Sequence, residues 1–323
     1  MPAPRACGGL KTAAPQQPKL PTSAKMILGT TNTFGSSNLH VLLCIVQTIP
    51  NQAVAAARMG AQVAIICRVG RDPHGKRIRS ALREEGIAHG AVGQDRGQAT
   101  GVASIMVGEA GENCIVVIPG ANGMLAAHHV ADCHAKFAAA RVVVVQLEIP
   151  MPTASCALTL GRQAGALTLL NAAPAANLSE AQLIAVDWLV VNTEEATEML
   201  RAPVRSPEHA RLAAEALRRR GIKHVVITLG ADGLVFVSEG ISVHLDAPKA
   251  QAIDTTGAGD TFVGALAAGL AFGLHAPMAL RLGQAAAALA VERRGTQLAI
   301  PTRRQVLSRW PDLSASLANR LPL

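Results

Sequence analysis

Residues 141–171 read RVVVVQLEIPMPTASCALTLGRQAGALTLLN, and this stretch decides the fold class. Its opening run of apolar residues, 142–145, is typical of a strand whose two faces are both covered. Residues 150–165 follow with a helical pattern that ends at a glycine, and residues 166–171 form a second apolar strand. Strand, helix and strand in this order are the repeating unit of a mainly parallel sheet.

The same alternation continues on both sides of this stretch. It predicts an α/β, three-layer sandwich with a mainly parallel central sheet and helices on both faces. The expected elements are helices at 51–60, 72–86, 193–201, 207–221, 257–272 and 276–293, strands at 61–70, 186–192 and 223–230, and an antiparallel pair at 232–238 and 241–247.

A β-hairpin is expected at residues 99–119, where two apolar segments flank the turn sequence GEAGE. It does not fit the parallel sheet, so we interpret it as a small added lid. The wider organisation is predicted to be a disordered leader at 1–25, one large domain at 26–310 and a C-terminal tail at 311–323. The first 71 residues contain no Asp or Glu, which leaves organelle import as a weaker reading of the leader.

Composition narrows the class of partner. The chain has 323 residues, a formal charge of +8 and no tyrosine, and no block of Lys and Arg is interleaved with aromatics. This pattern argues against nucleic acid and favours a small phosphorylated ligand. No apolar run reaches membrane-spanning length. The six cysteines form no CxxC pair, which fits free thiols in a reducing compartment.

The heptad DTTGAGD at residues 254–260 precedes a long Ala/Leu/Gly helix. Glycines let backbone N–H groups approach a ligand, and a helix N-terminus adds a partial positive charge. Such a loop is able to hold a transferring phosphoryl group while Asp260 accepts a proton. The alternative is an Asp that only stabilises the helix dipole, and the heptad alone does not choose between the two.

Polar residues at the ends of other predicted strands favour the catalytic interpretation. Ligands bind beyond the carboxyl ends of parallel strands, and several candidates stand at such positions. They are Glu148, Asn192, Glu195 and the turn from Gly230 to Gly233.

Together these motifs resemble the ribokinase-like (PfkB-type) carbohydrate kinases. The resemblance covers about Asn51 to Pro301, and DTTGAGDTFVGAL matches the family's C-terminal signature. Further matches to the ribokinase branch are NQAVAAARMGA, TGVASI, GEN, IPGAN, QLE, NAAPA, ITLGADG and GTQ.

The resemblance implies ATP-dependent phosphorylation of D-ribose to D-ribose 5-phosphate. It makes Asp260 the base, with an anion hole formed by the N–H groups of Gly257, Ala258 and Gly259. Ribose is expected to contact Asn51, Glu148 and Asp260. The implied ATP site consists of Asn192, Thr228, Gly230, Gly233, Gly259 and Gln284.

The resemblance also implies two cations. Glu195 is expected to act on Mg²⁺ through its water shell. A potassium ion is expected beside the anion hole, held by Asp254, the carbonyls of Thr256, Ala290 and Arg293, and Gly295. The implied partners are ribose and ATP, with neither nucleic acid nor membrane. The expected assembly is a homodimer through the lid, weakened if the lid is incomplete. The expected location is the cytoplasm, with the nucleus as an additional one.

The match fails before Asn51. The family has a Gly-Gly-Lys-Gly run there, whereas this chain has CIVQTIP, and Phe34 stands where the family has a ribose-binding Asp. The first strand is expected at MILGTTN, residues 26–32, and Ala299 replaces a hydroxyl residue near the cation. One hypothesis is that residues 27–50 reflect an altered start, a splice variant or a frame change.

Three functions remain open at this point. The first is a ribokinase, and the second is a kinase for another sugar or nucleoside. The third is a kinase-like protein that binds ATP but has impaired sugar binding. The intact Asp260 loop favours the first two, and the missing glycines favour the third.

Overall fold

The computed structural model describes residues 40–44, 51–107 and 113–318. The chain divides into two units, residues 1–32 and 33–323, and every described residue belongs to the second. The predicted leader at 1–25 and the predicted strand at 26–32 therefore lie outside the described residues.

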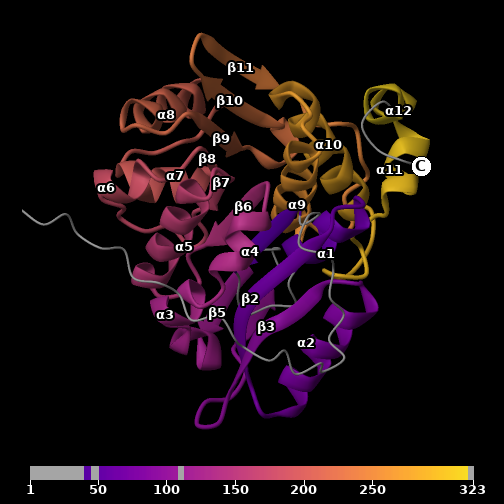
Figure 1. Cartoon of the computed structure of the whole chain (residues 1–323). Helices are drawn as coiled ribbons and strands as arrows, with labels where there is room; N and C mark the ends of the chain where they lie inside the picture. Colours follow the sequence, from indigo (N-terminus) through magenta and orange to yellow (C-terminus); the bar gives the residue numbers. More distant parts are fainter. Residues whose placement is uncertain (1–39, 45–50, 108–112, 319–323) are drawn as a thin grey trace, which may run out of the picture. The chain divides into compact units, whose positions relative to one another are not determined.

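A nine-stranded sheet forms the centre of the described part (Figure 1), in the order β11-β10-β9-β8-β7-β6-β1-β2-β3. Neighbours from β9 to β3 are parallel, and β10 and β11 add an antiparallel edge. The strands are β1 (Val41–Cys44), β2 (Val63–Gly70), β3 (Ala88–Asp95), β6 (Val142–Gln146), β7 (Leu167–Asn171), β8 (Trp188–Asn192), β9 (His224–Thr228), β10 (Leu234–Ser238) and β11 (Ile241–Leu245).

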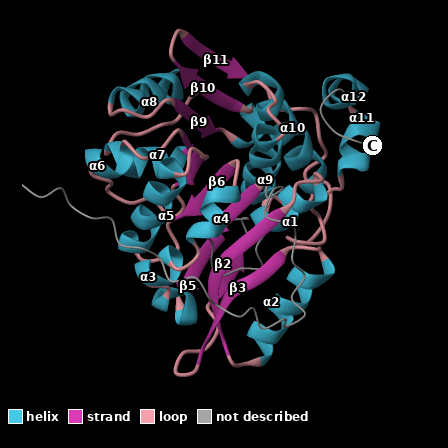
Figure 2. Ribbon diagram, viewed as in Figure 1, coloured by secondary structure: helices cyan, strands magenta, loops and turns pink. Residues whose placement is uncertain are grey.

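Helices cover both faces of this sheet, as Figure 2 shows. In the helix layer on one face of the sheet, α9 packs against α1 and α10. In the layer on the other face, α5 packs against β6 and β7. The helices are α1 (Asn51–Arg58), α2 (Pro73–Glu84), α3 (Ala127–Ala131), α4 (His134–Ala139), α5 (Met151–Gln163), α6 (Glu180–Leu183), α7 (Thr193–Leu200), α8 (Pro207–Arg219), α9 (Ala258–Ala271), α10 (Ala276–Ala290), α11 (Arg303–Arg309) and α12 (Pro311–Ala318), with short 3₁₀ turns η1 (Gly120–Met124) and η2 (Gly230–Asp232).

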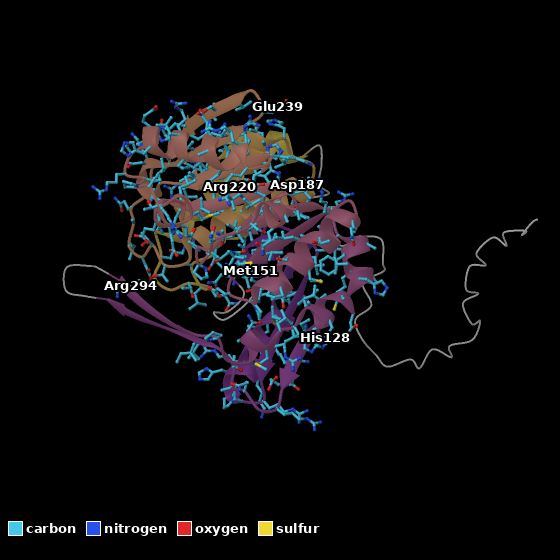
Figure 3. All side chains as sticks on the ribbon, turned by 90° about the vertical axis from the view of Figure 1, so that its left-hand side faces the viewer. His128, Met151, Asp187, Arg220, Glu239 and Arg294 are labelled. Atoms are coloured by element: carbon cyan, nitrogen blue, oxygen red, sulfur yellow. The ribbon has the colours of Figure 1, made fainter. Side chains whose placement is uncertain are left out.

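The predicted α/β sandwich is confirmed, and so is the separate hairpin. Strands β4 (Val102–Val107) and β5 (Asn113–Ile118) pair antiparallel in a two-stranded sheet of their own. Figure 3 shows this hairpin extending away from the main sheet.

Two strands were not expected. The segment of β3 reads AHGAVGQD, whose glycines and polar residues give a weak strand signal, and only Val92 within it is buried. Strand β1 comes from a stretch without a recognisable pattern, yet it lies between β2 and β6 in the middle of the sheet. Pairing with two apolar neighbours fixes these four residues as a strand.

Small residues dominate the packing of α9. All ten residues from Phe262 to Ala271 are buried, and most of them are Ala, Gly or Leu. Gly264 faces α1 so closely that a Cβ there would overlap the carbonyl oxygen of Gln52 and lie 2.6 Å from the Cβ of Ala55. The two helices therefore meet backbone to backbone, and this contact positions the site described below.

The described part of the predicted tail is also packed. Leu313 of α12 is buried in the core, and Asp312 pairs with Arg281 of α10 at 2.8 Å. Among the described helices, none has the length and apolarity needed to cross a bilayer.

Candidate active site

Three adjacent parallel strands end in an amide side chain. Gln146 is the last residue of β6, Asn171 of β7 and Asn192 of β8. Gln146 and Asn171 stand in register, so their side chains meet at the same edge of the sheet. This carboxyl edge is where open α/β sheets bind ligands.

Helix α9 directs its N-terminus at this edge. Gly257 is its N-cap with φ of 79°, a left-handed conformation that favours glycine, and Asp260 lies in the first turn. Of the predicted anion-hole donors, Gly259 is exposed, whereas the N–H of Ala258 donates to the carbonyl of Thr255 at 3.2 Å. The loop thus places glycine backbone beside Asp260, as the motif predicts.

Amide groups from α1 hold the Asp260 carboxylate. Asn51 Nδ2 donates to Oδ2 at 3.1 Å, and Gln52 Nε2 donates to Oδ1 at 3.0 Å. Gln146 Nε2 lies 3.5 Å from the same Oδ1. Both oxygens of the carboxylate are therefore bound by neutral N–H donors.

Burial and these donors act on Asp260 in opposite directions. The residue keeps part of its surface exposed, yet its carboxyl is surrounded densely enough for burial to raise its pKa. Hydrogen bonds from Asn51, Gln52 and Gln146 lower the pKa, and burial is the larger effect. A carboxyl with a raised pKa is a better proton acceptor than an exposed one.

Glu148 lies two residues after the end of β6 and is half-buried. Burial raises its pKa to about 7, and the neighbouring charge of Asp260 adds to the rise. Carboxyls whose pKa is raised by burial and by a neighbouring charge are common at functional sites. The structure therefore brings Glu148 and Asp260 together, as the sequence suggested.

Asn192 and Glu195 cap helix α7 reciprocally. Glu195 N–H donates to Asn192 Oδ1 at 2.7 Å, and Asn192 N–H donates to Glu195 Oε2 at 2.8 Å. This capping box gives both residues a structural role besides the predicted ones. Burial raises the pKa of Glu195 to about 7, although the hydrogen bond from Asn192 lowers it.

The predicted nucleotide residues lie around the end of β9. Thr228 Oγ1 is 3.5 Å from the carbonyl of Val191. Gly230 and Gly233 have φ of 60° and 90°, so the turn between them depends on glycine. Gln284 of α10 donates from Nε2 to the carbonyls of Leu245 and Asp246, both at 3.1 Å, and so fixes the chain after β11.

Asp254 joins the two loops that carry the predicted potassium ligands. Its Oδ1 accepts the Thr256 N–H at 3.0 Å, and its Oδ2 accepts the Gly295 N–H at 2.9 Å. The carbonyl of Ala290 accepts the N–H of Arg293 at 3.1 Å. The predicted ligands therefore gather in one region, at the ends of the loop before α9 and of helix α10.

The chemistry of these donors fits the implied cations. The potassium set consists of carboxylate and carbonyl oxygens, the ligands that hard cations prefer. Within the part of the chain that the structure describes, no group of three or more His, Cys, Asp or Glu residues is arranged to hold a metal. A single carboxylate such as Glu195 suits Mg²⁺, which keeps several waters and binds mainly to substrate phosphates.

Sequence reasoning missed Gln52, Gln146 and Asn171. All three lie within quoted motifs but carry no charge, and their roles depend on the approach of α1 to α9. The available signal was an amide closing each apolar strand, in VVVVQ and LTLLN. Phe34 and residues 45–50, where the family's glycine run is expected, lie outside the described residues.

Comparisons with known proteins show the family to which this chain belongs. The model of the pfkB family of carbohydrate kinases matches residues 50–303. Ribokinase of Haemophilus influenzae is 38% identical over 257 residues, covering 80% of this chain and 84% of the relative. Mouse ribokinase is 38% identical over 261 residues, covering 79% and 81%. The structure of Arabidopsis thaliana ribokinase complexed with ribose and ATP has a TM-score of 0.76 at 25% identity, covering 84% of this chain and 98% of that one. Since the family model spans well over half of the chain, this protein belongs to the pfkB family of carbohydrate kinases.

Proposed function

We propose that this protein transfers the γ-phosphoryl group of ATP to D-ribose, giving D-ribose 5-phosphate. The observation that carries the proposal is the position of Asp260. Its carboxylate lies in the first turn of α9, beside a glycine-containing loop, with amide donors on both oxygens. The relatives named above support ribose as the sugar and ATP as the donor.

In this reaction Asp260 accepts the proton of the sugar hydroxyl, and the resulting oxygen attacks the γ-phosphorus. Backbone N–H groups of Gly257, Ala258 and Gly259 at the positive end of α9 stabilise charge on the transferring group. The nucleotide lies along Asn192, Thr228, the turn Gly230–Gly233 and Gln284.

Two buried acceptors support a polyhydroxyl ligand. Asn51 Oδ1 and Gln52 Oε1 are buried and have no hydrogen-bond partner in the described part of the chain. A buried acceptor without a donor is unfavourable, and sugar hydroxyls next to Asp260 would satisfy it. Glu148 is the proposed third sugar contact.

Two cations complete the proposal. Mg²⁺ is proposed to act near Glu195, where it neutralises phosphate charge, and K⁺ near Asp254, where it orders the loop before α9. The proposed location is the cytoplasm and the proposed assembly a homodimer through the β4–β5 hairpin.

The test is ATP-dependent phosphorylation of ribose, 2-deoxyribose, other sugars and nucleosides, with and without K⁺. Asp260→Asn should lower kcat by about 10³-fold or more, because general-base catalysis and charge are both lost. Asp312→Asn, a surface carboxylate change, is the control. Equal rates for wild type and Asp260→Asn would refute the base assignment. ATP binding without turnover of any sugar would favour the kinase-like protein with impaired sugar binding. Turnover of another substrate would favour a kinase for another sugar or nucleoside.

A further inference from the structure

A chain of buried amides connects Asp260 to the backbone of strand β8. Gln52, Gln146 and Asn171 are only 1%, 5% and 8% exposed. Asn171 does not reach Asp260, but it contacts both glutamines that do, with Gln52 Nε2 2.9 Å and Gln146 Nε2 3.4 Å from its Oδ1. Its own Nδ2 donates to the carbonyl of Val190 at 3.1 Å.

The direction of this chain is fixed by its end. A backbone carbonyl only accepts hydrogen bonds, so Asn171 must turn Nδ2 toward Val190 and Oδ1 toward the glutamines. Oδ1 in turn only accepts, so Gln52 and Gln146 must both present N–H groups. Those N–H groups are the ones that meet Asp260.

The two oxygens of Asp260 consequently differ. Oδ1 accepts from Gln52 at 3.0 Å and from Gln146 at 3.5 Å, whereas the described residues give Oδ2 one such donor, Asn51 at 3.1 Å. A carboxylate oxygen has two lone pairs, so Oδ1 is saturated and Oδ2 retains one acceptor position.

We propose that Asn171 is a positioning residue, which orients Gln52 and Gln146 so that Oδ2 of Asp260 receives the proton of the sugar hydroxyl. This inference rests on the proposed function of Asp260. In the step, the hydroxyl O–H bond breaks and its proton moves to Oδ2. The hydroxyl oxygen forms a bond to the γ-phosphorus of ATP. The bond from the γ-phosphorus to the bridging oxygen breaks, and its electron pair leaves with ADP.

Other groups also act on Asp260 and must be separated from the amides. Glu148, after β6, and Glu195, on α7, are the carboxyls whose charges interact with it. The N-terminus of α9 contributes its partial positive charge. Variants that leave both glutamates unchanged therefore isolate the contribution of the amides.

The experiment compares Asn171→Leu, Gln52→Met and the double variant. Thr153→Val is the matched control, because Thr153 is 1% exposed and donates to the carbonyl of Leu125 at 2.6 Å, away from Asp260. Measurements are kcat and KM for both substrates, the pH profile of kcat, the melting temperature, and ¹³C NMR titration of the Asp260 carboxyl, assigned with Asp260→Asn.

Each single variant should lower kcat by about 10- to 100-fold while KM for ATP stays near the wild-type value. The acid limb of the kcat profile and the Asp260 titration should both move up by about one pH unit, because donors to the charged form are lost. The double variant should be no slower than the slower single variant, since Asn171→Leu already misaligns Gln52. Thr153→Val should lower the melting temperature only.

If the fold-losses in kcat of the two single variants multiply in the double variant, the inference is overturned. A slower kcat with an unmoved Asp260 titration, which is the outcome of a merely structural role, would also overturn it. If Asp260→Asn keeps the wild-type rate, the proposed function fails instead. The NMR titration still decides whether Asn171 acts on Asp260, because it does not depend on turnover.

Discussion

Gly264 and Gln52 stand in contact across helices α9 and α1, with no room for a side chain between them. A Cβ on Gly264 would overlap the carbonyl oxygen of Gln52 and come within 3.0 Å of the backbone nitrogen of Ala56. The neighbouring atoms are mostly backbone, so relief requires α1 to move as a unit. The same turn of α1 holds Asp260, which ties the packing of two helices to the geometry of the site.

Gly264→Ala should therefore impair both stability and catalysis. Overpacking of this kind costs about 1–3 kcal/mol of the free energy of unfolding. Displacement of Asn51 and Gln52 should lower kcat by about 10-fold or more. Gly269→Ala is the control on the same helix, since its Cβ would meet Ala279 at 3.2 Å and demand a smaller shift. Thermal melts and steady-state rates measure both effects, and an unchanged kcat in Gly264→Ala would contradict the link.

The raised pKa of Glu148 predicts a pH-dependent stability. The ordinary pKa of this carboxyl is 4.5, and its pKa in the folded protein is about 7. At pH values between these two, the folded protein therefore binds more protons than the unfolded chain. The stabilisation from protonated Glu148 is complete below pH 4.5 and is lost as the pH rises through about 7.

Glu148→Gln removes this loss and should be more stable than wild type at pH 8, by about 1–3 kcal/mol, with a smaller difference at pH 5. Glu195 titrates in the same direction in both proteins and cancels in the comparison. The control is Glu239→Gln, a change at an exposed carboxylate on the β10–β11 turn that Figure 3 labels. Melting temperatures across this pH range provide the test, and parallel curves for wild type and Glu148→Gln would count against it.

Asp254→Asn should weaken the response to potassium. Both carboxylate oxygens accept backbone N–H groups, from Thr256 and Gly295. An amide offers one acceptor only, so one N–H faces another donor and the two loops separate. Activity at a fixed K⁺ concentration should fall about 10-fold or more, as expected for loss of a charge-assisted contact. Titration of the rate with K⁺ measures it, with the exposed Asp246→Asn as control; an unchanged K⁺ response would exclude this site.

Gly233→Ala should affect ATP more than the sugar. Gly233 has φ of 90°, and a Cβ there would overlap the carbonyl oxygen of Leu245, which Gln284 holds in place. We expect KM for ATP to rise about 10-fold, because two loops of the proposed nucleotide site must shift. Gly240→Ala has a similar φ of 69° but open space around its Cβ, so it tests backbone strain alone. Equal KM values for the two variants would place the nucleotide elsewhere.

Long apolar runs made most of the fold predictable. The strand at 142–146 and the helix after it are visible in sequence because burial on both faces requires a continuous apolar run. Strand β3 is not visible, because AHGAVGQD gains its conformation from pairing with β2 rather than from its own composition.

The site divides in the same way. Asp260, Glu148 and Glu195 were predictable because charged residues at strand and helix ends stand out against an apolar background. Gln52 and Asn171 were not predictable, since neutral amides are common and the contact between them depends on the close approach of α1 at Gly264. Proximity created by tertiary packing has no signature within a single segment.

The anchoring of Asn171 on Val190 has an evolutionary consequence. The acceptor is a main-chain carbonyl, which every amino acid supplies, so substitution at position 190 leaves the orientation of the amides intact as long as β8 keeps its place. Position 171 has no such freedom, because few side chains combine one donor and one acceptor at that reach. The orientation of the amides beside Asp260 is therefore sensitive to substitution at position 171 and tolerant of it at position 190.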